Sequence, residues 1–244
     1  MFLYLPILTL AVFSFNKAKT MAVWSGFSLK WYETLANDRD LKEALFNSIL
    51  LGVLSCGISA IIGTLGAVGM ARVKYKTKGM MEYLSTIPIM IPDIILGMVF
   101  LVFFSMLNLP FGMTTLVIAH TTFCIPYIFM MVKARLVGID KSLEEAARDL
   151  GAGPIRTFFD ITMPLIAPAV LSGSLLAFAM SFDDVVISIF VNGPRLNTLP
   201  VKVYAQLKTG VTPEINALCT IILVVITAVL LLSSFLSKRA EKKY

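Results

Sequence analysis

Long apolar stretches separated by short polar segments dominate the chain. A transmembrane helix needs about 20 consecutive apolar residues to cross about 30 Å of hydrocarbon. The pattern predicts an all-α, polytopic membrane protein with six transmembrane helices in one domain over residues 1–244. The expected spans cover residues 1–15, 44–71, 83–107, 111–134, 163–191 and 214–237.

The first of these stretches is short for a span, and no basic residue precedes it. We expect that a few residues are missing from its start. A cleaved signal peptide is the alternative, although no small-residue cleavage site follows cleanly. We retain the stretch as a transmembrane helix.

Composition agrees with a membrane protein. Hydrophobic residues make up 57% of the chain and charged residues only 15%, and the mean hydropathy is +0.84. These values lie far from those of a water-soluble domain. The net charge of +6 therefore indicates membrane topology, and no nucleic-acid partner is needed to explain it.

Lysine and arginine predict the orientation, because cytoplasmic loops of membrane proteins retain positive charge. If residues 72–82, 133–162 and the tail from 238 are cytoplasmic, they hold thirteen of the 21 basic residues. The longer loops at 16–43 and 192–213 hold the other eight, together with acidic residues that offset them. Both termini are therefore expected to face the cytoplasm.

A polar island at residues 140–162 lies between two apolar stretches. Asp140 or Ser142 can cap a helix that begins near Leu143, and acidic residues in its first turn complement the helix dipole. Gly151, with Gly153 and Pro154 after it, predicts the end of this helix. A second amphipathic stretch then leads back to the membrane. We interpret the island as a cytoplasmic docking site for a soluble partner.

Spacing within the island resembles the signature loop of ABC importer permeases, which reads Glu-Ala-Ala, three residues, Gly, nine residues, Ile, one residue, Leu-Pro. The matching residues are Glu145, Ala146, Ala147, Gly151, Ile161 and Pro164, whereas Met163 replaces the leucine. The two side chains have similar volumes. The resemblance implies a type I ABC importer permease fold, in which this helix couples the chain to a separate ATP-binding subunit.

Three carboxylates fall inside predicted spans, namely Asp93, Asp183 and Asp184, and no lysine or arginine lies in those spans to pair with them. Ionisable residues at membrane depth are costly and usually face a water-filled pathway or a partner. We expect that the missing positive charge arrives with the substrate. The sequence therefore predicts transport of a cationic solute.

Adjacent helical residues point about 100° apart, so Asp183 and Asp184 cannot face the same way in a continuous helix. Asp184 shares a small, polar stripe with Ser181 and Ser188, whereas Asp183 falls on an apolar stripe. We expect Asp184 and Ser181 to line the pathway and Asp183 to support or gate it. The alternative is a close helix contact with a protonated Asp184.

Asp93 follows Pro88 and Pro92, which remove backbone donors and break the regular hydrogen-bond ladder. Irregular backbone at membrane depth is tolerated where it lines a cavity. Phe100 and Phe104 follow on the same face. Their rings either attract an ammonium group or pack against lipid, which is the more frequent role.

Over nearly the whole chain, from Phe15 to Ser237, the sequence is similar to the C-type permeases of spermidine/putrescine ABC importers. The segments that carry this resemblance are residues 30–32, 92–94, 143–151, 181–186 and 192–217. It implies a linear polyamine as cargo, and it implies transport roles for Trp31, Asp93, Glu145, Ser181, Asp183 and Asp184. Trp31 is equally interpretable as an interfacial anchor.

The partners implied by the resemblance are a sister permease, a cytoplasmic dimer of ATP-binding subunits and an extracytoplasmic polyamine-binding protein, all around a chain embedded in lipid. The chain has no G-x-x-x-x-G-K-[ST] phosphate loop. We therefore expect a permease subunit that is not itself an enzyme, without cofactor or metal.

Other features of the sequence indicate structure. Cys56, Cys124 and Cys219 lie in separate apolar segments without metal-ligand spacing. His120 is expected to be a hydrogen-bonded structural residue. A row of small residues with four-residue spacing predicts that another helix approaches the second span closely: Ser55, Ser59, Gly63, Ala67 and Ala71.

Three alternative functions remain open. The same machinery is compatible with ferric ion or thiamine, whereas sulfate would be repelled by intramembrane carboxylates. An ion-coupled secondary transporter would use the aspartates as proton sites and would need no ATPase. An intramembrane aspartyl protease fits poorly, because adjacent aspartates diverge on a helix and the glycine-rich active-site motif is absent.

Overall fold

The computed structural model describes residues 2–19, 23–72, 76–194, 196–209 and 213–241. Within these ranges the chain is helical apart from short connections, and an isolated antiparallel bridge pairs Asn16 with Phe27. The all-α prediction is confirmed. The expected basic positions Lys74, Lys242 and Lys243 lie outside the described residues.

Contacts group the chain into two compact units, one formed by residues 1–43 and 202–244 and the other by residues 44–201. In the first unit, η1 (Phe2–Tyr4), α1 (Leu5–Phe13) and α2 (Lys30–Asn37) accompany α12 (Pro213–Glu241). Both α1 and α2 pack against α12. Residues 39–43 of α3 (Arg39–Arg72) and the later part of α11 (Leu199–Thr209) also belong to this unit.

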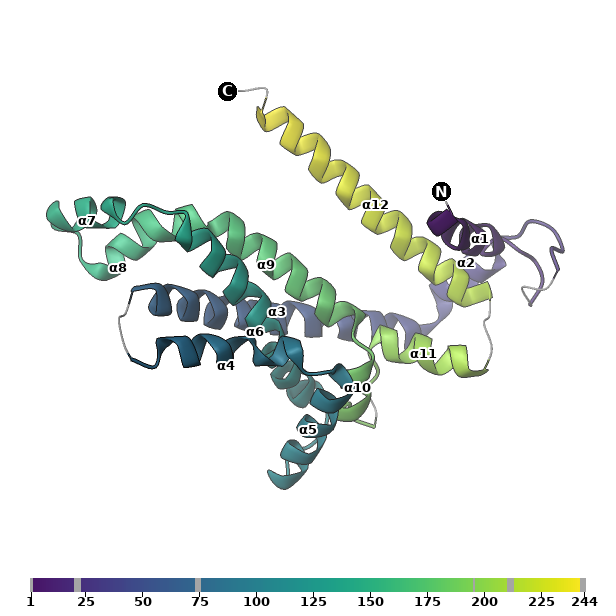
Figure 1. The fold of residues 1–244 in the computed structure, drawn as a ribbon. Coiled ribbons are helices and arrows are strands. Elements are labelled where there is room, and N and C mark those ends of the chain that lie inside the picture. The colour runs from purple at the N-terminus through teal and green to yellow at the C-terminus, as the bar shows by residue number, and fades with distance from the viewer. Residues whose placement is uncertain (1, 20–22, 73–75, 195, 210–212, 242–244) are drawn as a thin grey trace. The chain divides into compact units, whose positions relative to one another are not determined.

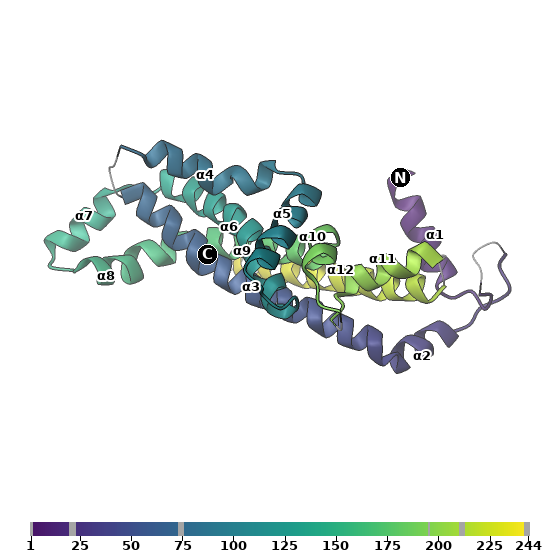
Figure 2. The same ribbon diagram turned by 90° about the horizontal axis from the view of Figure 1, so that it is seen from below.

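The second unit holds most of α3 and all helices from α4 to α10. These are α4 (Lys78–Met90), α5 (Asp93–Met106), α6 (Met113–Val137), α7 (Ser142–Asp149), α8 (Pro154–Thr157), the π-helical turn η2 (Phe158–Thr162), α9 (Met163–Asp183) and α10 (Val186–Val191). Helices α6 and α9 lie side by side, and α7 and α8 form a hairpin beyond their ends (Figures 1 and 2).

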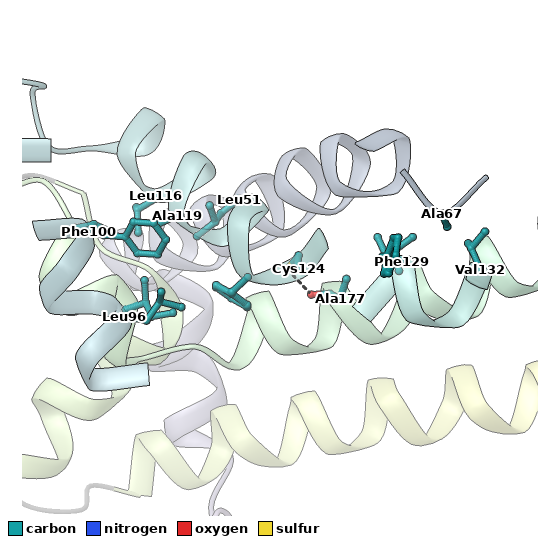
Figure 3. Packing of buried hydrophobic residues seen from close by; sticks show 14 of the residues in the cluster. Leu51, Ala67, Leu96, Phe100, Leu116, Ala119, Cys124, Phe129, Val132 and Ala177 are labelled. Carbon is teal, nitrogen blue, oxygen red and sulfur yellow. Dashed lines mark hydrogen bonds between the residues drawn. The ribbon is translucent and has the colours of Figure 1, made fainter. Parts of the chain in front are cut away.

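The core of the second unit lies between α3, α5, α6, α9 and α10. Leu116, Ala119 and Cys124 of α6 are fully buried there, and the Cys124 thiol reaches the carbonyl of Ala177 on α9 at 3.4 Å (Figure 3). Phe100 and Phe104 of α5 stack with a centroid distance of 5.6 Å and are themselves buried. Both rings therefore pack inside the protein, whereas the alternative interpretation expected them to face lipid.

The small-residue row of the second span is confirmed as a close helix contact. Ser55, Ser59, Gly63 and Ala67 are buried, whereas Ala71 is exposed. The Ser59 hydroxyl donates to the backbone carbonyl of Thr121 on α6 at 3.1 Å. A Cβ placed on Gly63 would lie 3.1 Å from the carbonyl oxygen of Ile125. Only a small side chain fits at this crossing.

Two expected spans are broken rather than continuous. The stretch at 83–107 divides into α4 and α5, which meet at an angle of 105°. Pro88 is accommodated inside α4, and the break falls at Ile91 and Pro92. Proline disfavours the helical conformation of the residue before it, and Ile91 is extended, with ψ 128°.

The stretch at 163–191 divides after Asp183, because Asp184 is extended (φ −68°, ψ 125°) and a new helix begins at Val186. The prediction of a single regular helix through Asp183 and Asp184 was therefore wrong. Three described helical segments are long and apolar enough to cross a membrane, namely α3, α6 and Pro154–Asp183, and the bent pair α4 and α5 makes a fourth. The count of six spans stays a prediction.

Candidate functional site

A buried polar cluster forms where α3, α6, α9 and α10 meet, and His120 of α6 is at its centre. The His120 ring is completely buried. Its Nδ1 lies 2.8 Å from the hydroxyl of Ser181, and its Nε2 lies 3.2 Å from the hydroxyl of Ser188. Ser181 continues the chain of contacts to the Ser55 hydroxyl of α3 at 3.1 Å. The prediction that His120 is a hydrogen-bonded structural residue is confirmed.

Asp184 completes this cluster and is well supplied with partners. One carboxylate oxygen accepts from the backbone N–H and the hydroxyl of Ser188, both at 2.8 Å, and the other accepts from the N–H of Ile187 at 3.2 Å. His120 Nε2 lies 3.5 Å from the same carboxylate. The side chain is only 8% exposed. Asp184 thus has hydrogen-bond partners inside the protein, and none of these partners is a lysine or an arginine.

These contacts give Asp184 a structural task at the break between α9 and α10. Acidic side chains that accept backbone N–H groups stabilise the start of a helix. Asp184 does this for α10, and the break in the chain lets its side chain reach both the new helix and His120. Ser181 is 3% exposed. Asp184 and Ser181, the two predicted pathway residues, are thus brought together by their shared contact with His120, between the packed helices.

Asp183 and Asp93 differ from Asp184 because both are exposed on the described chain. Asp183 is the last residue of α9, and Asp93 is the first residue of α5. Both carboxylates therefore lie next to a break in a helix.

Trp31 belongs to the other unit of the chain and is held by its own neighbours. The indole N–H donates to the backbone carbonyl of Asn16 at 2.7 Å, and the side chain is 8% exposed. Lys30 places its ammonium 5.6 Å from the centre of the indole. These contacts anchor the loop before α2.

The polar island forms the predicted bent helix. Helix α7 begins at Ser142. The backbone N–H of Ser142 donates a hydrogen bond to the Asp140 carboxylate at 3.0 Å. This hydrogen bond lowers the pKa of the exposed Asp140 carboxyl below its ordinary value. Asp140 therefore holds the first residue of α7, but the N-cap position is Lys141, which makes no side-chain cap, so the predicted cap at Asp140 or Ser142 is not formed.

Gly151 ends α7 in the left-handed conformation, with φ +85°. The N–H of Gly151 donates to the carbonyl of Arg148 at 2.8 Å, and the N–H of Ala152 donates to the carbonyl of Ala147 at 3.0 Å. This pair of hydrogen bonds defines a Schellman motif, in which glycine is strongly preferred. The backbone conformation therefore explains the glycine at position 151. Lack of space does not explain it, since nothing lies within 4 Å of a Cβ placed there.

The other signature residues lie on this hairpin and at its return to α9. Glu145 and Ala146 are exposed on α7, Ala147 is half-buried, Ile161 lies half-buried in η2, and Pro164 is exposed in the first turn of α9. Large apolar side chains beside them are turned outward: Leu143 is 48% exposed, Leu150 89%, Ile155 75% and Phe159 62%. Such an exposed apolar surface is typical of an interaction site.

Sequence reasoning missed the contacts that tie this hairpin to the helix bundle. Arg72, at the end of α3, donates to Glu144 at 2.5 Å and also to the Thr162 hydroxyl. Thr162 donates in turn to the same Glu144 oxygen at 2.8 Å. We call Arg72, Glu144 and Thr162 the latch. Two features of the sequence could have indicated the latch. Arg72 comes just after an apolar run, and Glu144 is an acid in the first turn of α7.

Electrostatics favour the ionised latch. Partial burial alone would raise the pKa of Glu144, but hydrogen bonds from Arg72 and Thr162 and the positive charges of Arg72 and Arg148 outweigh it. The pKa of Glu144 therefore lies below its ordinary value. Arg72 and Glu144 keep side-chain exposures of 25% and 17%.

The fold of this chain also occurs in solved ABC transporters. Similar folds occur in a bacterial ABC transporter involved in the import of the acidic polysaccharide alginate (TM-score 0.73, 17% identity, 97% of this chain and 90% of that chain). A second is the inward-facing MetNI methionine ABC transporter (TM-score 0.65, 19% identity, 82% of this chain and 95% of that chain).

The chain belongs to the family described as the binding-protein-dependent transport system inner membrane component, whose model matches residues 59–242. It is 41% identical to the putrescine transport system permease PotI of Escherichia coli K12 over 99% of this chain and 89% of that protein. It is 40% identical to the spermidine/putrescine transport system permease PotC of the same strain, over 99% and 91% of the two chains. The PotC of Haemophilus influenzae is 39% identical over 98% and 93%.

Proposed function

We propose that this chain is a permease subunit of an ATP-driven importer that moves polyamines across the bacterial cytoplasmic membrane. The observation that carries the proposal is its similarity, over nearly its full length, to polyamine permeases of two bacteria. Polyamines carry several ammonium groups along a flexible chain. The intramembrane acids of this chain have the complementary charge.

Exposed carboxylates are the best candidates to meet this cargo. Asp93 and Asp183 are exposed beside helix breaks, and irregular backbone at membrane depth is typical of a transport pathway. Asp184 already accepts hydrogen bonds from Ser188 and Ile187. We assign polyamine contact to Asp93 and Asp183, and we assign to Asp184 and Ser181 the shape of the pathway wall. Trp31 is proposed to act from the extracytoplasmic loop.

The hairpin of α7 and α8 is proposed to dock on a cytoplasmic ATP-binding subunit, one of a pair in the complete transporter. Its exposed apolar side chains are suited to a partner's groove. The latch joins this hairpin to α3, so movement of the docked hairpin reaches the helix bundle. A sister permease and an extracytoplasmic polyamine-binding protein complete the assembly. In this arrangement both termini are cytoplasmic and six helices cross the membrane.

Uptake of radiolabelled putrescine by cells that express the complete transporter tests the cargo assignment. Asp93→Asn and Asp183→Asn should each lower uptake about tenfold or more, because a charge-assisted contact to an ammonium is lost. Glu33→Gln, a control at an exposed position of α2 outside the spans and the docking hairpin, should leave uptake unchanged. If Asp184→Asn abolishes uptake in an assembled complex while Asp183→Asn does not, the contact residue is Asp184.

Gly151 tests the docking assignment. Gly151→Ala places a Cβ on a residue in the left-handed conformation and should destabilise the end of α7 by about 1 kcal/mol. We expect weaker copurification of the ATP-binding subunit and lower substrate-stimulated ATP hydrolysis. Gly153→Ala is the matched control, because Gly153 has φ −67°. Equal behaviour of the two variants would contradict docking through α7.

A further inference from the structure

A pocket of about 270 Å³ lies at the end of the bundle from which α7 emerges. Helices α3, α4 and α6 form its walls, and the segment between α6 and α7 closes one side. Four of its lining residues are charged: Lys78 and Glu82 from α4, Lys133 from α6, and Lys141 just before α7. Lys141 lies in the polar island, but none of the four is a signature residue or a member of the buried cluster around His120.

Positive charge is in excess in this pocket. Glu82 forms an ion pair with Lys133 at 2.9 Å, and this pair links α4 to α6. Lys78 and Lys141 have no ion-pair partner in the part of the chain that the structure describes. Two ammonium groups are thus available to an anion that enters the pocket.

The remaining wall is apolar. Met70 of α3 and Leu136 of α6 line the pocket with Ile139. On the same side of α4 as Lys78 and Glu82, the surface beyond the pocket also carries exposed apolar side chains, with Met81 41% and Ile89 38% exposed. A small inorganic anion would use the ammonium groups but leave this surface uncovered. A ligand that joins an anionic group to hydrocarbon uses both.

The position along the helices fits a lipid headgroup. Lys78 begins α4, and Lys141 follows α6, a helix long and apolar enough to cross a membrane. Basic pockets between transmembrane helices at the cytoplasmic surface are suited to anionic lipid headgroups. The choice of leaflet rests on the proposed function, which places α7 in the cytoplasm.

We propose that this pocket binds an anionic phospholipid of the inner leaflet. Its phosphate lies between Lys78 and Lys141, and its acyl chains follow the exposed apolar face of α4. The Glu82–Lys133 ion pair holds α4 and α6 at the spacing that the headgroup requires. A bound lipid would therefore hold α4 beside the segment that leads into the docking hairpin.

Native mass spectrometry of the purified, complete transporter tests this site. The complex is titrated with phosphatidylglycerol and, in parallel, with zwitterionic phosphatidylcholine. Phosphatidylglycerol should bind more tightly, and Lys78→Ala or Lys141→Ala should each weaken that preference about fivefold, the effect of about 1 kcal/mol per basic residue at a membrane surface. Lys76→Ala is the matched control, since Lys76 is exposed at the same end and does not line the pocket.

Equal binding of the two lipids, or an equal loss in the Lys76 variant, would overturn the proposal. Displacement of half of the bound phosphatidylglycerol by added inorganic phosphate would indicate a site for a free anion. That result would also overturn the proposal. In a Val137→Cys variant, on the rim of the pocket, a bifunctional reagent that joins thiols to amines should produce no crosslink to the sister permease. Crosslinking there would show that a protein covers the pocket. Copurification of the ATP-binding subunit, measured in the same samples, reports separately on the proposed function.

Discussion

At the scale of single residues, the two neighbouring aspartates have different surroundings. Asp184 accepts backbone N–H groups at the start of α10 and lies against His120, whereas Asp183 is exposed at the end of α9. Burial of a charged carboxylate is tolerated only when hydrogen bonds and charges compensate it. Asp184 meets this condition without a cargo.

Sequence reasoning identified the aspartate doublet but not this division. It assumed that a helix of regular period passes through both residues, and on that assumption placed Asp184 with Ser181 and Ser188. The three residues do share one cluster. The three side chains meet because α9 ends at Asp183 and Asp184 hydrogen-bonds the start of α10. A regular helical period does not describe this change of direction.

The latch yields a prediction about charge. Replacing Arg72 or Glu144 by alanine should each cost about 1–3 kcal/mol, because the partner keeps a partly buried charge. The double variant should cost clearly less than the sum of the two. Thermal unfolding of the purified complex, with hydrogen exchange of α7, measures the effect. Arg156→Ala and Asp160→Ala remove an exposed ion pair with side-chain exposures of 78% and 59% and serve as controls. Additive effects at the latch would contradict it.

The pH dependence of the latch has a definite sign. Because the pKa of Glu144 is lowered in the folded protein, its contribution is complete above the unfolded pKa and is lost as pH falls through the folded value. Protection of α7 from hydrogen exchange should stay constant, after correction for intrinsic rates, between about pH 7 and about pH 5. It should decline only at more acidic pH. Glu144→Gln should remove this acid transition.

At the scale of helices, small residues fix how closely α3, α6 and α9 approach. Gly63 of α3 faces the backbone of Ile125, and a Cβ on Gly173 of α9 would lie 3.1 Å from the Cα of Ile128. The four-residue spacing in the second span predicted the first contact correctly. Pro92 correctly predicted the irregular backbone before Asp93. The break after Asp183 was less visible, because hydropathy averages over an interruption of two residues.

Gly63→Leu should therefore force α3 away from α6. Overpacking of a close contact typically costs about 1–3 kcal/mol, and here the nearest atoms belong to the backbone, which cannot rotate aside. The matched control is Gly57→Leu on the same helix, since nothing lies within 4 Å of a Cβ at Gly57. Thermal stability of the purified complex should fall for the first variant alone. A similar loss in both would mean that helix propensity, not packing, decides.

At the scale of the whole molecule, composition predicted an all-α membrane protein, and the family match agrees. Hydropathy works for this purpose because every backbone polar group in lipid must be satisfied within its own helix. The assembly could not be derived in the same way. Exposed apolar residues such as Leu150 and Ile155 identify an interaction surface, but their exposure does not specify which partner covers it.

The energy source separates the importer from an ion-coupled transporter, and it is a property of the complete assembly. A membrane potential, negative inside, favours entry of each positive charge by about 2.3 kcal/mol per 100 mV. Vesicles that contain the permease pair without the ATP-binding subunits should nevertheless fail to accumulate putrescine when only a proton gradient is imposed, because α7 then has no partner to move it. Vesicles with the complete transporter, binding protein and internal ATP should accumulate it. Accumulation in the first preparation would assign the exposed aspartates to proton coupling and remove the role proposed for the docking hairpin.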